Sequence, residues 1–154
     1  LCAVCVAKGM EFLNAPYETI QKVTEELVRS DGERYCFSKS QEEVDTLLWE
    51  AQLKYVFPLV ENYRRYFVKK YYDFIKAALP INNGYGDQVM VPEEAELGNL
   101  MYLVERGGIP VSAEESMELK RYRKARNELA HMNLLSNEEL CVILKAGKHK
   151  TASD

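Results

Sequence analysis

The chain has 154 residues, enough for one domain with its own core, and its 47% hydrophobic and 29% charged residues are ordinary for a globular protein. A formal net charge of −4 argues against a protein that coats nucleic acid non-specifically. No apolar run approaches the roughly 20 residues that span a bilayer, so we expect a cytoplasmic protein with no membrane segment.

Residues 1–37 are predicted to form a helical lead-in. The chain starts with Leu1 rather than Met, and no charged segment precedes the apolar residues 1–7. We therefore interpret the start as continuing from a removed preceding region, not as a signal peptide. Pro16 is predicted to open a helix that ends near Arg29. The spacing of the apolar residues in this helix predicts four inward side chains, Ile20, Val23, Leu27 and Val28.

The cysteines do not form a metal-binding pattern. Cys2 and Cys5 are spaced as C-x-x-C, but a zinc site needs a second ligand pair at similar spacing. The only histidines in the chain are His131 and His149. We therefore expect reduced thiols, no metal site and no cofactor.

The chain is predicted to contain four to six helices with short connections, which indicates an all-α bundle. Residues 38–147 are predicted to form this bundle, which is the main domain. The longest helical pattern spans residues 41–79 and starts at Ser38 or Ser40 as the N-cap. A helix of this length would measure about 58 Å, more than the width of such a domain. Pro58 lacks an amide hydrogen, so a kink or a break is predicted there. The predicted inward stripe is Val44, Leu47, Leu48, Ala51, Tyr55 and Leu59.

Residues 63–74, in the second part of this pattern, mix aromatic side chains with arginine and lysine. Such a mixture can stack on single-stranded nucleic acid and neutralise it. The alternative is a core helix whose basic residues form its solvated side, and we favour this alternative.

Residues 80–91 are predicted to be a turn, because they contain Gly84 and Gly86 but no G-K-[ST] sequence of a phosphate-binding loop. A helix from Pro92 to Arg106 is predicted to follow. Its glycine, Gly98, is predicted to permit close packing, and its predicted inward residues are Leu97, Leu100, Met101 and Val104.

The C-terminal part of the chain has a second capping signal. Ser136 followed by Glu139 predicts the start of a last short helix, which runs through Leu144. Residues 148–154 are polar and are predicted to form a flexible tail.

The segment 112–133 carries the candidate site. It lies between the helix predicted to end at Arg106 and the last helix, predicted to start at Ser136. Ser112 followed by Glu115 is the pattern of a capping box, which predicts the start of a helix. Apolar residues then recur in steps of three and four, so one narrow face should meet the core: Tyr122, Ala125, Leu129 and Met132. Five basic residues within seven positions make this helix locally positive: Lys120, Arg121, Arg123, Lys124 and Arg126.

Around this predicted helix, the side chains of Arg126 and His131 point in different directions. At roughly 100° per residue, Arg126 lies about 80° from the centre of the apolar face and His131 about 140° away in the same sense. Asn127 lies in the arc between them. One helix therefore does not easily bring Arg126 and His131 onto one small group. Two such helices from two subunits, packed across a symmetry axis, can do so.

The sequence from Arg126 to His131, RNELAH, resembles the Arg-x4–6-His motif of HEPN domains (higher eukaryotes and prokaryotes nucleotide-binding). Four residues intervene here, and the first of them is the polar Asn127. The family consists of all-helical modules, many of them metal-independent ribonucleases. The resemblance is sharp over residues 119–135 and loose over the helical pattern from residue 41. The alternative interpretation is a solvated polar face with an incidental histidine.

The resemblance implies a metal-independent endoribonuclease, either a toxin or a defence effector, in which Arg126 and His131 are catalytic and Asn127 orients the phosphate or the imidazole. The expected partners are RNA, a second copy in a homodimer, and an antitoxin or a larger parent protein. The alternative function is a non-catalytic HEPN-like module that dimerises or binds a nucleotide for a larger protein. Three further basic residues are predicted to bind substrate, namely Lys120, Arg123 and Lys124.

Overall fold

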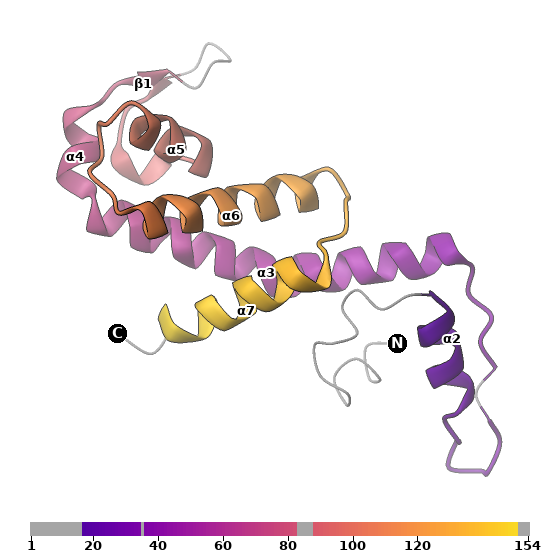
Figure 1. Cartoon of the computed structure of the whole chain (residues 1–154). Helices are drawn as coiled ribbons and strands as arrows, with labels where there is room; N and C mark the ends of the chain where they lie inside the picture. The colour runs from indigo at the N-terminus through magenta and orange to yellow at the C-terminus, as the bar shows by residue number, and fades with distance from the viewer. Residues whose placement is uncertain (1–16, 35, 83–87, 151–154) are drawn as a thin grey trace.

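The computed structural model describes residues 17–34, 36–82 and 88–150, without the side chains of residues 146–150. Within these residues the chain forms six α-helices, one 3₁₀ turn and one two-stranded sheet, which confirms the predicted all-α class (Figure 1). The predictions for Cys2, Cys5 and Pro16, for the centre of the turn at 83–87 and for the end of the tail at 151–154 lie outside the described residues.

Helix α3 (Gln41–Lys70) is the axis of the fold. Ser40 caps it, since the Ser40 hydroxyl accepts from the Glu43 N–H and the Glu43 carboxylate accepts from the Ser40 N–H. Of the kink or break predicted at Pro58, the break does not occur, because α3 continues through Pro58 and ends at Lys70, before the short α4 (Tyr72–Ala77). Pro58 is exposed, as is Lys54, whose carbonyl loses its helical partner, so water can satisfy that carbonyl.

The buried side of α3 differs from the predicted stripe. The prediction placed Ala51 and Tyr55 inward, but Tyr55 is 46% exposed, and the fully buried Gln52 lies one position after Ala51. The Gln52 Nε2–H donates to the Leu135 carbonyl at 3.2 Å, and the Leu135 N–H donates to Gln52 Oε1 at 2.7 Å. These two bonds make burial of the amide possible. The buried residues of α3 are Val44, Leu48, Gln52, Val56, Val60, Tyr63, Phe67 and Val68.

Two helices pack on α3 to form the main core. Helix α6 (Ala113–Ala130) runs antiparallel along the second half of α3, and α7 (Asn137–Lys150) crosses α3 near its middle (Figure 1). The ring of Tyr63 on α3 stacks on that of Tyr122 on α6, with centroids 4.0 Å apart. Helix α7 extends beyond the predicted end at Leu144 and past residue 147, where the bundle was predicted to end. Its predicted cap is present, with the Ser136 N–H donating to the Glu139 carboxylate and the Glu139 N–H to the Ser136 hydroxyl.

Helix α5 (Leu97–Glu105) covers α6 at the end of the bundle where α4 lies. The segment predicted as a turn contains a small hairpin, β1 (Ile81–Asn82) and β2 (Gln88–Val89), in which Ile81 pairs with Val89 and Asn82 with Gln88. The predicted helix from Pro92 is instead a 3₁₀ turn, η2 (Pro92–Glu94), followed by α5. The side chain of Arg64 on α3 donates to the carbonyl of Glu93 in η2 and to that of Ala95, which follows η2, so both carbonyls are bound outside the pattern of an α-helix.

Helix α2 (Tyr17–Glu25) packs on the start of α3 in a second, smaller cluster that contains Ile20, Val44 and Leu48. It ends at Glu25, not near Arg29, and only Ile20 of its four predicted inward residues is buried. Val28, for example, is 59% exposed. Val23 and Leu27 are half-buried, and Leu27 and Val28 lie beyond the end of α2, where helical spacing no longer applies. Among the described helices, none is long and apolar enough to cross a membrane.

Candidate functional site

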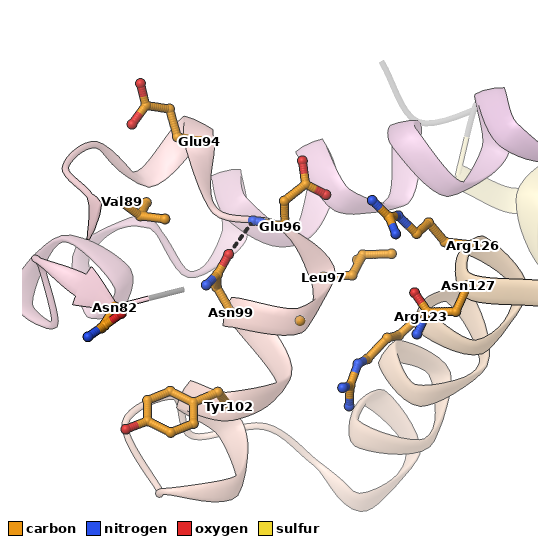
Figure 2. A pocket seen from close by; sticks show the side chains of 11 residues that line it. Asn82, Val89, Glu94, Glu96, Leu97, Asn99, Tyr102, Arg123, Arg126 and Asn127 are labelled. Atoms are coloured by element: carbon orange, nitrogen blue, oxygen red, sulfur yellow. Dashed lines mark hydrogen bonds between the residues drawn. The ribbon is translucent and has the colours of Figure 1, made fainter. Parts of the chain in front are cut away.

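A pocket of about 640 Å³ opens between α5 and α6, within the size range of small-molecule sites (Figure 2). Three of its lining residues lie on α6, and the others come from the hairpin, from η2 and from the start of α5. The lining residues are Asn82, Val89, Glu94, Glu96, Leu97, Gly98, Asn99, Tyr102, Arg123, Arg126 and Asn127. We call this the α5–α6 pocket.

The α6 wall of this pocket is the polar side of an amphipathic helix. Its opposite side, with Tyr122 and Leu129, is buried in the core, so Arg123, Arg126 and Asn127 face outward. Figure 2 shows Arg126 extending toward Glu96, and Arg123, on the other side of Asn127, extending toward the end of the pocket where Tyr102 lies. Within the described parts of the chain, neither guanidinium has an ion-pair or hydrogen-bond partner.

The α5 wall supplies amide, aromatic and acidic groups. The Glu96 N–H donates to Asn99 Oδ1 at 3.0 Å, which fixes the first turn of α5 and orients the Asn99 amide. Tyr102, one turn after Gly98 and Asn99, is 43% exposed, and the Arg106 guanidinium lies over its ring, 4.7 Å from the centroid. Gly98 is exposed, and a Cβ added there would meet no atom within 4 Å, so the predicted close packing at Gly98 is wrong.

Arg64 holds the α5 wall in place from behind. Its guanidinium donates to the carbonyls of Glu93 at 2.7 Å and Ala95 at 3.2 Å, and it forms two hydrogen bonds with Glu61. These bonds from Arg64 lower the pKa of Glu61 to about 2, so this pair stays charged at neutral pH. The neighbouring Arg65 also contacts Glu61, with 2.9 Å between Arg65 Nε and Glu61 Oε1.

His131 lies at the end of α6 and is not among the lining residues of the α5–α6 pocket. The helix closes with a Schellman motif: the Asn133 N–H donates to the Glu128 carbonyl at 2.9 Å, and the Met132 N–H to the Leu129 carbonyl at 3.2 Å. Met132 takes the left-handed position, with φ of 61°, and is 65% exposed. The prediction that Met132 continues the apolar face is therefore wrong, because the helix has already ended.

The end of α6 is fixed on α3, while the imidazole stays free to solvent. The Trp49 Nε1–H donates to the Leu129 carbonyl at 2.8 Å, and Gln52 binds the backbone of Leu135 on the other side of the turn. The His131 N–H is bound within the cap, by the carbonyls of Asn127 and Glu128. The side chain of His131 is exposed. The backbone position of His131 is therefore well defined, although no described side chain orients its ring.

The other predicted substrate-binding residues divide between the two sides of α6. Arg123 lies in the α5–α6 pocket, and Lys120 is exposed one turn before it. Lys124 points the other way and pairs with Glu139 on α7 at 2.6 Å. The hydrogen bond to Glu139 raises the pKa of Lys124. The structure therefore brings Arg123, Arg126 and Asn127 together but leaves Lys124 and His131 outside this pocket.

Sequence reasoning missed the α5 side of the pocket. Gly98 and Tyr102 are four residues apart and share one face of α5, opposite the apolar residues that pointed inward in the prediction. A glycine and an aromatic residue on the solvated face were the available signal. Asn82 and Glu96 carried no such signal, because the hairpin and the cap of α5 bring them to the pocket.

No group of three or more His, Cys, Asp or Glu side chains that could hold a metal ion occurs in the parts of the chain that the structure describes. Cys36 and Cys141 are exposed free thiols. Comparison with known proteins found no matching family model, no matching curated protein and no matching solved structure. The HEPN resemblance thus rests on the residues of the motif and on the helical context.

Proposed function

We propose that this chain is a metal-independent endoribonuclease of the HEPN type that acts as a homodimer. One observation carries the proposal: Arg126, with no partner among the described residues, lines an open pocket on the same helix that ends in the exposed His131. A permanently charged, unpaired guanidinium in a pocket is suited to binding a phosphate group.

The chemistry needs only these side chains and RNA. An imidazole takes the proton from a ribose 2′-hydroxyl, whose oxygen attacks the adjacent phosphorus. The bond to the 5′-oxygen breaks, and the imidazolium formed in the first step gives its proton to that leaving oxygen. The Arg126 guanidinium stabilises the negative charge that builds on the phosphate oxygens. The products are a 2′,3′-cyclic phosphate and a 5′-hydroxyl.

A second copy of the chain brings together Arg126 and His131, which lie apart within one copy. Arg126 lies inside the α5–α6 pocket and His131 lies at the exposed end of α6, outside it. In a two-fold dimer with the ends of α6 near the axis, His131 of one copy approaches Arg126 of the other. The exposed Ala130 beside His131 allows a close approach of the two backbones.

Incubating the purified protein with single-stranded RNA in EDTA tests this proposal. We expect cleavage that yields 2′,3′-cyclic phosphate ends, and no cleavage of DNA of the same sequence, because DNA lacks the 2′-hydroxyl. Cleavage that persists unchanged in the His131→Ala protein would assign the activity to a contaminating nuclease or to another site. No cleavage of any RNA by the intact dimer would favour the second function below.

The second candidate function is a non-catalytic module that binds a nucleotide for a larger protein. The observation that favours it is the position of His131 outside the pocket that holds both arginines. Calorimetric titration with a nucleotide separates the two functions. A binding module gives saturable binding that His131→Ala does not change, with no RNA cleavage.

A further inference from the structure

The two walls of the α5–α6 pocket differ in chemistry. The α6 wall carries Arg123 and Arg126, which have no partner among the described residues, whereas α5 carries the ring of Tyr102 and the amide of Asn99, both on its side away from α6 (Figure 2). Gly98 also lines the pocket. A ligand that reaches from one wall to the other therefore has an anionic end and a flat end with hydrogen-bonding groups.

Tyr102 is placed as a stacking surface. The Arg106 guanidinium covers its ring from one side, 4.7 Å from the centroid, and the side chain still has 43% of its surface exposed. The cation holds the ring in one orientation, and the ring lines the pocket. Single-stranded nucleic acids bind proteins by stacking bases on rings held in this way.

The acidic residues of the pocket limit how much negative charge it accepts. Glu94 and Glu96 lie at the end formed by η2 and the start of α5, and Figure 2 shows Arg126 extending toward Glu96 while Arg123 extends toward the other end of the pocket, where Tyr102 lies. The Glu96 carboxylate partly offsets the positive charge that Arg126 presents to a phosphate. Arg123 is therefore the cation best placed for a phosphate whose base lies on Tyr102.

We infer that the α5–α6 pocket binds one unpaired nucleotide of a single-stranded RNA, with the base stacked on Tyr102 and its phosphate on Arg123. The inference rests on the proposed function in one respect, since it leaves Arg126 for the neighbouring, scissile phosphate. A base in a duplex is stacked on its neighbours and cannot reach Tyr102. Double-stranded RNA is therefore excluded as a substrate.

The glycine at position 98 gives independent support for a ligand in the pocket. It lies within α5, where glycine is a poor helix former, and a Cβ added there would meet no atom within 4 Å. Among the described residues, no packing contact therefore requires glycine there. A base and ribose that cross the pocket from Tyr102 to Arg123 pass over Gly98, and a larger side chain would obstruct them.

Calorimetric titration of the full chain with AMP, ribose 5-phosphate and inorganic phosphate tests the inference. Stacking of one base contributes roughly 5- to 150-fold in affinity, so AMP should bind more tightly than ribose 5-phosphate by a factor in that range. Tyr102→Leu should abolish this difference and leave ribose 5-phosphate binding unchanged. Arg123→Ala should weaken both ligands. Equal binding of AMP and ribose 5-phosphate to the unmodified protein would overturn the inference.

Two further variants provide the controls. Tyr72→Leu replaces an exposed tyrosine of α4, outside the pocket, and should leave AMP binding unchanged. Gly98→Leu should lose AMP binding while keeping or raising Tm, since leucine favours a helix. Equal effects of Tyr102→Leu and Tyr72→Leu would overturn the inference. Tyr102-dependent AMP binding without RNA cleavage would refute the ribonuclease alone, and RNA cleavage without such binding would refute the nucleotide subsite alone.

Discussion

The first and second halves of α6 use their charged side chains differently. In the first half, the Glu115 carboxylate accepts from the Ser112 N–H, pairs with Lys70 and accepts from the Tyr71 hydroxyl at 3.0 Å. In the second half, Arg123 and Arg126 line a pocket with no partner among the described residues. The same helix therefore carries charges that the fold pairs, such as those of Glu115 and Lys124, and two that it leaves without a partner among the described residues, Arg123 and Arg126.

This difference separates stability from function along one helix. Paired groups such as Glu115 join α6 to α3, so their removal should cost stability. The two unpaired arginines contribute little to folding, so their loss should be visible only in binding or catalysis. Four sets of substitutions test this separation, and the sets are ordered here from the largest expected effect to the smallest.

Arg126→Ala should lower RNA cleavage by about 10²–10³ in rate, the typical cost of removing one group that stabilises charge in the transition state. His131→Ala should abolish cleavage, and Asn127→Ala should have a milder effect. All three should change the free energy of unfolding by less than about 0.5 kcal/mol, since these side chains are exposed. The matched control is Arg121→Ala, an exposed arginine of α6 outside the α5–α6 pocket. Similar rate losses for Arg121→Ala and Arg126→Ala would show that the position of Arg126 in the pocket is not what matters for cleavage.

Gln52→Leu should destabilise the fold by about 2–3 kcal/mol, because it leaves the buried N–H and C=O of Leu135 without partners. Urea unfolding monitored by circular dichroism measures this loss. Gln41→Leu, at the exposed start of α3, should have little effect on the same measurement. Loss of cleavage without any loss of stability in Gln52→Leu would contradict a purely structural role for this residue.

Glu115→Gln should destabilise the protein by roughly 1 kcal/mol at pH 7, because the ion pair with Lys70 is partly exposed and screened by solvent. The hydrogen bond from Lys70 lowers the pKa of Glu115 to about 2, below its ordinary value of 4.5. The carboxylate therefore contributes stability that is present above pH 4.5 and is lost as the pH falls through 2. The difference between wild type and variant should shrink over that range in urea unfolding. Glu114→Gln, which changes a neighbouring exposed carboxylate, should show no comparable trend.

Met132→Gly should stabilise the protein by about 0.5–1 kcal/mol, because glycine adopts the left-handed conformation of this helix cap at lower steric cost. Ala130→Gly, two residues earlier and still within α6, should instead destabilise the protein. Thermal unfolding of the two variants gives the comparison directly. A loss of stability in Met132→Gly as large as in Ala130→Gly would show that the cap geometry is wrong.

The parts of the fold that could be predicted from the sequence are those set by local signals. The capping pairs at Ser112 and Ser136 predicted two helix starts, and Ser40 was one of the two N-caps predicted for α3. The apolar spacing identified the buried residues Tyr122 and Leu129. These features depend on residues within one or two turns of each other, so one sequence is enough to find them.

The parts that could not be predicted depend on contacts between distant residues. The buried amide of Gln52 is matched by the backbone of Leu135, 83 positions away, and no hydropathy pattern marks such a pair. The end of α6 at Ala130 follows from a Schellman cap with Met132 in place of the usual glycine, so the stop signal was absent. For the same reason His131 was predicted on the face of a helix that in fact ends before it.

The candidate site was predicted on one of its two walls. Arg126, Asn127 and Arg123 share the solvated side of α6, which helical spacing reveals. The facing wall is assembled by the hairpin, by η2 and by the bonds of Arg64 to the carbonyls of Glu93 and Ala95. Those carbonyl contacts have no side-chain signature in the sequence.

The most direct test of the composite site is to combine two inactive proteins. Arg126→Ala and His131→Ala chains, co-expressed with different tags, form heterodimers in which one of the two sites regains both residues, Arg126 from one copy and His131 from the other. The equimolar mixture should recover about a quarter of the wild-type RNA cleavage, since half of the dimers are mixed and each has one intact site. An inactive mixture in which native mass spectrometry shows the heterodimer would contradict the composite site.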